Sequence, residues 1–341
     1  MKNDERPGYG LVSKYRAELM GFAILMIMFC HLDVAQSHNG FDVSFLGKVL
    51  HTFTVGVDVF MFLSGLGLYY SYSSKQPSYW SFEKKRLIRI LPLYFIIAGA
   101  TYILFDLILR KLTLAKLFRD LFFLSWFLSG STLYWYILAI VCFYALFPLL
   151  YRFIHGGKHG LVKVVVFSVL WWTLVGVGSK HSAMLESFKI ALDRLPIFMF
   201  GIYCGKLVRE NRRLRAVEWL SYFIIGYLAL IILLRTRVRA LSFVLYYPVR
   251  ALLGLSVIAT LILIMELLNR RIPRMARMLS EGMRWLGGLT LECYLFHQSY
   301  LILFAFPYRP AQYVLVAFVL PTVSAALLYL LRKCLRKGRH A

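Results

Sequence analysis

The fold is decided by long apolar stretches such as YWYILAIVCFYALFPLLYRFI at 134–154 and LVKVVVFSVLWWTLVGVG at 161–178, which the short segment HGGKHG separates. Each is long enough to cross a hydrocarbon core of about 30 Å as a helix that rises ~1.5 Å per residue. Similar stretches recur along all 341 residues, of which 60% are hydrophobic and only 16% are charged. A soluble globule is therefore excluded, and the sequence predicts an all-α, polytopic membrane bundle.

Ten spans are expected, and an even number places both termini on one side of the membrane. If that side is the cytoplasm, 27 of the 40 Lys and Arg residues lie on the inner side and 13 on the outer side, as the positive-inside rule predicts. We expect one membrane-embedded domain, 1–341, with a short cytoplasmic N-terminus at 1–16 and a basic tail at 333–341. The expected spans are 17–35, 52–72, 88–109, 134–154, 161–178, 194–209, 217–234, 249–268, 286–306 and 311–332.

The formal net charge of +24 does not indicate nucleic acid as a partner, because the basic residues gather at the ends of the expected spans. Anionic lipid headgroups attract basic residues there, so membrane lipids are the expected partners. The segment 114–130 is apolar but too short to span, which predicts an interfacial or re-entrant piece. The five cysteines show no metal or redox spacing, and no metal site or tightly bound cofactor is expected.

Few ionisable side chains fall inside the expected spans. Each is a candidate for function, because an ionised group in hydrocarbon is costly unless it faces the bundle interior or a cavity with water. The candidates are His31, Asp58, Asp106, Glu292 and His297, with Arg16, Arg86, Arg89 and Arg194 at or near the ends of spans.

His31 lies near the end of the first expected span, fifteen residues after Arg16. On a helix this separation is about 22 Å along the axis and about 60° around it, so both side chains can line one groove. The distance is close to the length of an acyl-CoA molecule, with phosphates at Arg16 and the thioester near His31. An imidazole that titrates near neutrality is suited to take a proton from a sugar hydroxyl. A structurally bonded histidine near the outer interface is the alternative interpretation.

Arg86 and Arg89 are three residues apart in FEKKRLIRILPLY, on one helix face at the cytoplasmic end of the third span. Two guanidinium groups there suit a cluster of nucleotide phosphates, because arginine binds phosphate oxygens in a planar, bidentate geometry. Ordinary positive-inside anchoring is the alternative, and it fits Lys84 and Lys85 better than Arg89.

The second span, GVDVFMFLSGLGLYYSY, buries Asp58 and continues into the small residues Ser64, Gly65 and Gly67. Asp58 needs a partner, either an arginine or a histidine whose tautomer it would fix, as a catalytic carboxylate does. Close approach of another helix explains the glycines. Ser64 is interpreted as a residue of helix packing rather than as a nucleophile that carries an acyl group.

The ninth span contains Glu292 and His297 in GGLTLECYLFHQSY. Five residues place them about 140° apart around the helix, so both must find partners on other spans. A polar network that holds the bundle together is the alternative to a functional role.

Six ordered blocks resemble the acyltransferase-3 family of bacterial integral membrane acyltransferases. The first three, GFAILMIMFCH, GVDVFMFLSGLGLYYS and KKRLIRILPLY, resemble the family's first helix with its terminal histidine, its second helix and its Arg-x-x-Arg entry to the third. LYWYILAIVCFYALFPLLY, RLPIFMFGIYCGKL and LTLECYLFH resemble later helices. The resemblance runs from about Tyr15 to about Tyr300.

One position departs from the family pattern. The family commonly has a basic residue eleven positions before the histidine, where this chain has Met20, and Arg16 lies four residues earlier. Four residues shift a position by ~6 Å along a helix and ~40° around it, so a long arginine side chain can reach the same phosphates.

The resemblance implies a membrane O-acyltransferase that moves an acyl group, usually acetyl, from cytoplasmic acyl-CoA to a hydroxyl of a carbohydrate or lipid-linked glycan of the cell envelope. It implies a multi-pass protein of the bacterial cytoplasmic membrane, with acyl-CoA as co-substrate. By the same resemblance, His31 is the general base, Arg86 and Arg89 bind the donor, and Arg194, Glu292 and His297 line the substrate site. The residues themselves add Asp58 as a second catalytic residue, Arg16 as a further donor-binding residue and Ser64 as a residue that lines the substrate site.

The competing hypothesis is a transporter or flippase of a glycan or lipid-linked substrate, which would also need buried charges and outer arginines. Arg235, Arg237 and Arg239, with Arg250 nearby, fall on the outer side and depart from the positive-inside bias. They fit an anionic glycan or a pyrophosphate-linked lipid carrier, and contact with anionic phospholipid fits them equally well. Release of CoA thiol distinguishes an acyltransferase from a transporter.

Overall fold

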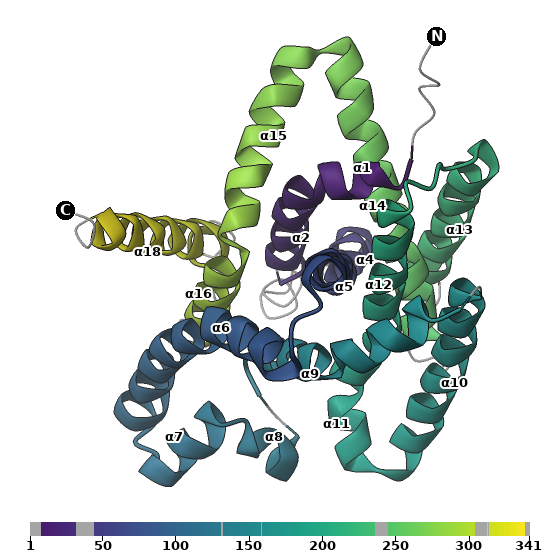
Figure 1. Cartoon of the computed structure of the whole chain (residues 1–341). Helices are drawn as coiled ribbons and strands as arrows, with labels where there is room; N and C mark the ends of the chain where they lie inside the picture. The colour runs from purple at the N-terminus through teal and green to yellow at the C-terminus, as the bar shows by residue number, and fades with distance from the viewer. Residues whose placement is uncertain are drawn as a thin grey trace.

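The computed structural model of the chain describes residues 8–31, 44–130, 132–157, 159–235, 245–303, 312 and 314–337. Almost all of these residues are helical, and among them only an isolated bridge between Gly8 and Arg213 has β geometry. The predicted all-α fold is confirmed, with the helices gathered into a bundle (Figure 1).

The helices follow one another with short connections. Three of them begin at a hydroxyl side chain that accepts a hydrogen bond from a backbone N–H of the first turn: Ser78, Thr113 and Ser182. The helices are α1 (Gly10–Lys14), α2 (Arg16–Cys30), α4 (Ser44–Thr52), α5 (Gly56–Lys75), α6 (Tyr79–Tyr102), α7 (Leu114–Leu121), α8 (Leu124–Ser129), α9 (Trp135–His155), α10 (Gly160–His181), α11 (Ala183–Leu192), α12 (Leu195–Arg209), α13 (Ala216–Arg235), α14 (Tyr246–Arg271), α15 (Pro273–Gly288), α16 (Thr290–Leu303) and α18 (Leu320–Lys337).

Within the described parts of the chain, seven helical stretches are long and apolar enough to cross a membrane, which confirms a multi-pass membrane protein. The three other expected spans correspond to α2, α12 and α16, which have 15, 15 and 14 residues. The total of ten spans and the cytoplasmic termini therefore stay predictions. The seven stretches are Val49–Lys75, Tyr79–Leu109, Trp135–His155, Gly160–His181, Val217–Arg235, Tyr246–Arg271 and Leu315–Arg332.

The segment that was expected not to span forms two short helices, α7 and α8. They meet at Phe123, which has a left-handed backbone with φ of 62°. Lys116 pairs with Asp120 one turn later, at 2.5 Å, on the polar side of α7. The segment therefore folds back on itself near α6, as an interfacial piece would.

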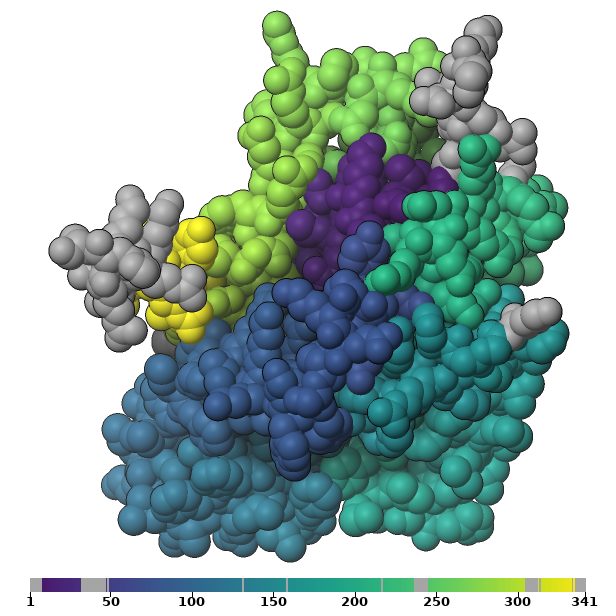
Figure 2. Space-filling view, in the orientation of Figure 1, coloured from purple at the N-terminus to yellow at the C-terminus, as the bar shows by residue number. Residues whose placement is uncertain are grey.

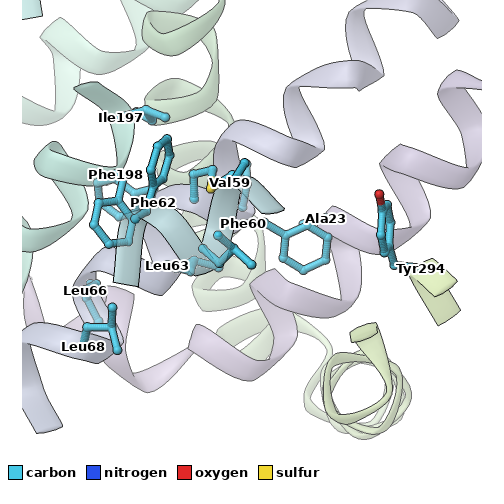
Figure 3. Close-up of a cluster of buried hydrophobic side chains, with 14 of the residues drawn as sticks. Ala23, Val59, Phe60, Phe62, Leu63, Leu66, Leu68, Ile197, Phe198 and Tyr294 are labelled. Carbon is cyan, nitrogen blue, oxygen red and sulfur yellow. The ribbon is translucent and has the colours of Figure 1, made fainter. Parts of the chain in front are cut away.

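The centre of the bundle is the packing of α5 against α12, where two glycines allow the backbones to touch. A Cβ atom at Gly65 would lie 2.2 Å from the carbonyl oxygen of Phe198, and one at Gly201 would lie 2.0 Å from that of Phe62. No side chain fits at either position. Apolar side chains from both helices fill the space around this contact (Figure 3).

Helix α2 lies between α5 and α15. A Cβ atom at Gly21 would lie 2.1 Å from the carbonyl oxygen of Met283, and one at Gly287 would lie 2.0 Å from that of Ala17. In the space-filling view the purple N-terminal helices lie between green α14 and α15 above and the blue segment of α5 and α6 below (Figure 2). Helix α2, which begins at Arg16 and ends directly before His31, is thus packed against other helices on several sides.

Candidate active site

The two ends of α2 carry the first predicted site residues. Arg16 is the first residue of the helix and His31 directly follows its last residue, Cys30. The side chain of Arg16 is half-buried, and its Nε donates a hydrogen bond to the carbonyl oxygen of Leu63 on α5, at 3.2 Å. The ring of His31 turns back along its own helix, with Nδ1 2.8 Å from the carbonyl oxygen of Ile27.

His31 and His297 are brought together, although 266 residues separate them in the chain. Nε2 of His297 lies 3.2 Å from Nδ1 of His31, and the ring centroids are 4.9 Å apart. Nδ1 of His297 lies 2.8 Å from the carbonyl oxygen of Ala317 in the π-helical segment Leu315–Val319. His297 is fully buried, with no exposed surface. The predicted need of His297 for a partner on another span is confirmed.

These contacts assign the tautomers of both neutral rings. A carbonyl oxygen only accepts, so Nδ1 of His297 carries its hydrogen and Nε2 of His297 is an acceptor. Nδ1 of His31 then faces two acceptors, the carbonyl of Ile27 and Nε2 of His297, and must carry the hydrogen of its own ring. The lone pair of neutral His31 is therefore on Nε2, which is the ring atom suited to accept a proton.

Arg16, Arg86 and Arg89 line one cavity of about 110 Å³, here called the arginine cavity. Arg16 comes from the start of α2, and the other two come from the first half of α6. Its walls also include Ile27, whose carbonyl binds the His31 ring, so the cavity follows α2 for about 16 Å at ~1.5 Å per residue. The other lining residues are Met20, Val57, Phe60, Ser64, Ile90, Trp135, Tyr136, Ile140, Tyr144, Thr290, Leu291 and Tyr294.

The electrostatics around the three arginines of this cavity favour an anion. Within the described residues, none of the three guanidinium groups forms an ion pair with a carboxylate at 4 Å or less. Nη2 of Arg86 donates to the hydroxyl of Ser71 at 2.7 Å, while its Nε is shielded from solvent without a hydrogen-bond partner. Three cations that share one cavity repel each other, and a bound polyanion would relieve this repulsion.

Gly67 leaves the space that the Arg16 side chain occupies. A Cβ atom at Gly67 would lie 2.7 Å from Nη2 and 2.9 Å from Cζ of Arg16. The predicted reason for the glycines, close approach of another helix, holds for Gly65 but not for Gly67. Met20, where a basic residue was expected from the family pattern, also lines the arginine cavity, so Arg16 reaches the cavity that a basic residue at position 20 would face.

Aromatic side chains occupy the middle of the arginine cavity. Tyr136 lies between Phe60 and Tyr294, with ring centroids 6.2 Å and 5.3 Å away. Phe60 and Tyr294 project from α5 and α16 in the close-up (Figure 3). Ser64 lines the cavity beside Tyr136 and Tyr144.

The partners of Asp58 are arginines and not a histidine, the other kind of partner that its position in the sequence allowed. Nη2 of Arg250 donates to Oδ2 of Asp58 at 2.7 Å and to the carbonyl oxygen of Thr54 at 2.8 Å. Nε of Arg194 lies 3.9 Å from Oδ1 of Asp58. All three charged side chains are buried, with exposed fractions of 2% for Asp58 and Arg194 and 5% for Arg250.

Arg194 connects this ion cluster with the arginine cavity. It does not line the cavity itself, but its guanidinium group lies 4.9 Å from the ring centroid of Trp135, which does. Lys189 and Asp193 form a second buried pair at 2.5 Å, next to Arg194 in the chain. The cluster therefore holds three cations and two carboxylates behind one wall of the cavity.

Glu292 pairs with Arg332 of α18 at 2.7 Å, so it also has the partner on another span that was predicted. Neither residue lines the arginine cavity. Arg250 was expected near the run of outer arginines, and the structure buries it in an ion pair with Asp58 at 2.7 Å. Arg235 is exposed at the end of α13, and Arg237 and Arg239 lie outside the described residues.

The sequence interpretation missed Trp135, Tyr136 and Tyr144, which line the cavity, and Arg250 as the partner of Asp58. Tyr136 and Tyr144 are eight residues apart in LYWYILAIVCFYALF, about 80° around a helix, which was the available signal for these two, whereas Trp135 lies about 180° from Tyr144. Among the described residues, no group of three or more His, Cys, Asp or Glu side chains is arranged to hold a metal ion.

Comparison with known proteins adds one finding to this geometry. The profile of an acyltransferase domain matches residues 19–331, essentially the whole chain. No curated protein and no solved structure matches the chain significantly. The matched region contains every site residue described above except Arg16 and Arg332, which lie just outside its two ends. The chain therefore belongs to the acyltransferase-3 family and is a membrane acyltransferase.

Proposed function

We propose that the protein is an O-acyltransferase that moves an acyl group, in the first instance acetyl, from cytoplasmic acyl-CoA to a hydroxyl of a carbohydrate or lipid-linked glycan. The observation that carries the proposal is the arginine cavity. Three guanidinium groups that form no ion pair with a described carboxylate line it, and it extends along α2 to the residue that holds the His31 ring.

The donor end is assigned to the three arginines. CoA carries several phosphate groups at one end and its thioester at the other, and arginine binds phosphate oxygens through paired N–H donors. With the phosphates at Arg16, Arg86 and Arg89, an extended donor that follows α2 brings its thioester about 22 Å away, to the level of His31. The aromatic side chains in between contact the apolar part of the donor.

The transfer step is assigned to His31. Nε2 of His31 takes the proton of the acceptor hydroxyl, and the oxygen attacks the carbonyl carbon of the thioester. The new C–O bond forms, the C–S bond breaks, and the proton passes to the CoA thiolate, which leaves as the thiol. His297 is a positioning residue, because its Nε2 accepts from Nδ1 of His31 and fixes the tautomer.

The acceptor is expected from the outer face, near the end of α2. Asp58 holds Arg250 directly and faces Arg194, whose guanidinium group stacks on Trp135 at the cavity wall. The role proposed for Asp58 is thus to keep Arg194 and Trp135 in place beside the acyl group. A cation behind this wall also favours the negative charge that develops on the carbonyl oxygen during transfer.

The experiment measures transfer of labelled acetyl from acetyl-CoA into the glycan and lipid fractions of membranes that contain the protein. His31→Ala is expected to abolish transfer without changing the affinity for CoA. His181→Ala, at an exposed histidine, is the control and is expected to transfer normally. Full transfer by His31→Ala would contradict the assignment of the base.

Donor binding is tested by titrating the purified protein with CoA. Arg86→Gln is expected to weaken CoA binding about tenfold or more, since a hydrogen bond to a charged group contributes about 1.5–3 kcal/mol. Lys85→Gln removes the same charge from an exposed neighbour and is expected to bind CoA normally. If the wild-type protein neither moved label nor released CoA thiol with any of several acyl-CoAs, glycan transport would replace acyl transfer as the hypothesis.

A further inference from the structure

A second cavity, here called the lateral slot, lies between α12 and α13 and has a volume of about 300 Å³. It exists because these two consecutive helices pack on different partners, α12 on α5 and α13 on α14. Its walls come from six helices and are mainly apolar, with Leu161, Phe200, Ile225 and Ile258 among them. None of the residues that line the arginine cavity lines the slot.

An apolar slot of this size at the depth of the membrane needs an apolar occupant. Water is unstable there, because each molecule needs two to four polar partners. An empty slot would leave the atoms of its walls without the contacts that a packed interior makes. In a bilayer, the chain that fits is the hydrocarbon tail of a lipid.

One polar group in the wall of the slot has no hydrogen-bond partner among the residues that the structure describes. Nε1 of Trp219 is shielded from solvent and makes no hydrogen bond within the described residues. An indole N–H only donates, and it usually finds an acceptor when it is buried. The oxygens of a lipid ester or phosphate are acceptors at the depth where tryptophan commonly lies.

The end of the slot next to Trp219 is basic. Arg212 and Glu218 line it, and their side chains pair at 2.9 Å. Arg215 lies 3.5 Å from the same carboxylate, and its side chain is 74% exposed. One carboxylate therefore faces two guanidinium groups, which leaves a net positive charge where a headgroup would lie.

We propose that the lateral slot binds one anionic glycerophospholipid, with an acyl chain between α12 and α13, an ester or phosphate oxygen at Nε1 of Trp219, and the phosphate beside Arg212 and Arg215. The tail accounts for the apolar walls, the oxygen for the unpartnered N–H, and the phosphate for the basic mouth. The site is separate from the arginine cavity and does not depend on acyl transfer.

The experiment uses the full-length protein in vesicles of equal parts phosphatidylcholine and phosphatidylglycerol. The protein is extracted into detergent, and the phospholipid that stays bound is quantified by mass spectrometry. The wild-type protein is expected to keep about one phosphatidylglycerol per chain. Trp219→Phe, which removes the N–H donor but keeps an aromatic ring, and Arg215→Gln are expected to lower this amount several-fold.

Two controls make the same chemical changes on α15. Trp285→Phe and Arg274→Gln alter exposed residues, and both are expected to keep the lipid. A thermal unfolding scan of each variant establishes that it is folded. Equal retention of the two lipids by the wild-type protein, equal losses in test and control variants, or retention of a free fatty acid or polyprenyl lipid instead would overturn the proposal.

Discussion

Gly67→Ala is the sharpest test of the donor site, because it displaces a guanidinium group without removing a charge. The added methyl group would lie 2.7 Å from Nη2, 2.9 Å from Cζ and 3.0 Å from Nε of Arg16. Carbon makes comfortable contact only at about 3.5 Å or more, so the end of the Arg16 side chain must retreat by about 0.8 Å. The bond from its Nε to the carbonyl of Leu63 is lost or lengthened.

The size of the effect follows from that displacement. A hydrogen bond from a charged donor contributes about 1.5–3 kcal/mol, and every 1.4 kcal/mol is a factor of about ten in affinity. Because a flexible side chain recovers part of the contact, we expect CoA to bind about tenfold more weakly. The helix itself gains, since alanine is more favourable than glycine in a helix by about 0.8–1 kcal/mol.

The assay is titration of the purified protein with CoA, combined with transfer kinetics at saturating donor. Gly67→Ala is expected to raise Kd and KM for the donor and to leave kcat nearly unchanged. Gly99→Ala on α6 makes the same change where no atom lies within 4 Å, and it is expected to behave as the wild-type protein.

A double variant distinguishes the cause. In an Arg16→Gln background, Gly67→Ala is expected to weaken binding no further, because both changes act on the same contact. Wild-type CoA affinity in folded Gly67→Ala protein would refute the assignment of Arg16 to the donor phosphates. Additive losses in the double variant would refute the mechanism of displacement.

Three further outcomes are expected. His297→Ala removes the acceptor of the Nδ1 hydrogen of His31. It is expected to lower kcat about tenfold, or about 1.4 kcal/mol, and to leave Kd for CoA unchanged. Tyr300→Phe on the same helix is the control, and an unaltered kcat of His297→Ala would contradict the positioning role. Asp58→Asn removes the negative charge that faces two buried arginines and is expected to lower the free energy of unfolding by about 3–5 kcal/mol. Lys14→Gln breaks a half-exposed pair with Glu266 and is expected to lower it by at most about 1 kcal/mol. Thermal unfolding compares the two variants, and equal losses would argue against the burial of the cluster. Gly201→Val forces α5 and α12 apart and is expected to prevent the accumulation of folded protein, as measured by size-exclusion chromatography in detergent. Gly282→Val, at a position with open space around it, is the control and is expected to accumulate. Normal yields of both variants would contradict the close packing.

Much of the fold could be predicted from hydropathy, because the cost of unpaired backbone groups in lipid leaves helices as the main solution. The expected span 134–154 corresponds to α9 at Trp135–His155, and 161–178 corresponds to α10 at Gly160–His181. Hydropathy placed the start of the third span at 88, whereas α6 begins at Tyr79, because Ser78 caps polar turns that precede the apolar part. The span expected at 286–306 is interrupted, because α15 ends at Gly288 after packing against α2.

The features of the candidate site that depend on a single helix could be predicted from the sequence. The helical spacing of Arg86 and Arg89 was sufficient to place them on one face, and both line the arginine cavity. The pairing of His31 with His297 and of Asp58 with Arg250 depends on how distant helices rotate against each other, which no local pattern encodes. Gly67 shows the same limit, since its function is set by the Arg16 side chain of another helix.

The small volume of the arginine cavity matters for how well the membrane that holds the protein excludes ions. Sites that enclose a drug-sized ligand usually have about 300–1,000 Å³, and this cavity has about 110 Å³. Phe60, Tyr136 and Tyr294 line it, with the ring centroids of Phe60 and Tyr294 6.2 Å and 5.3 Å from that of Tyr136. Under the proposed function, the helices must part to admit the donor, and the donor itself then fills the opening. Such a closed resting state would let a membrane hold many copies of the protein and still keep its ion gradients.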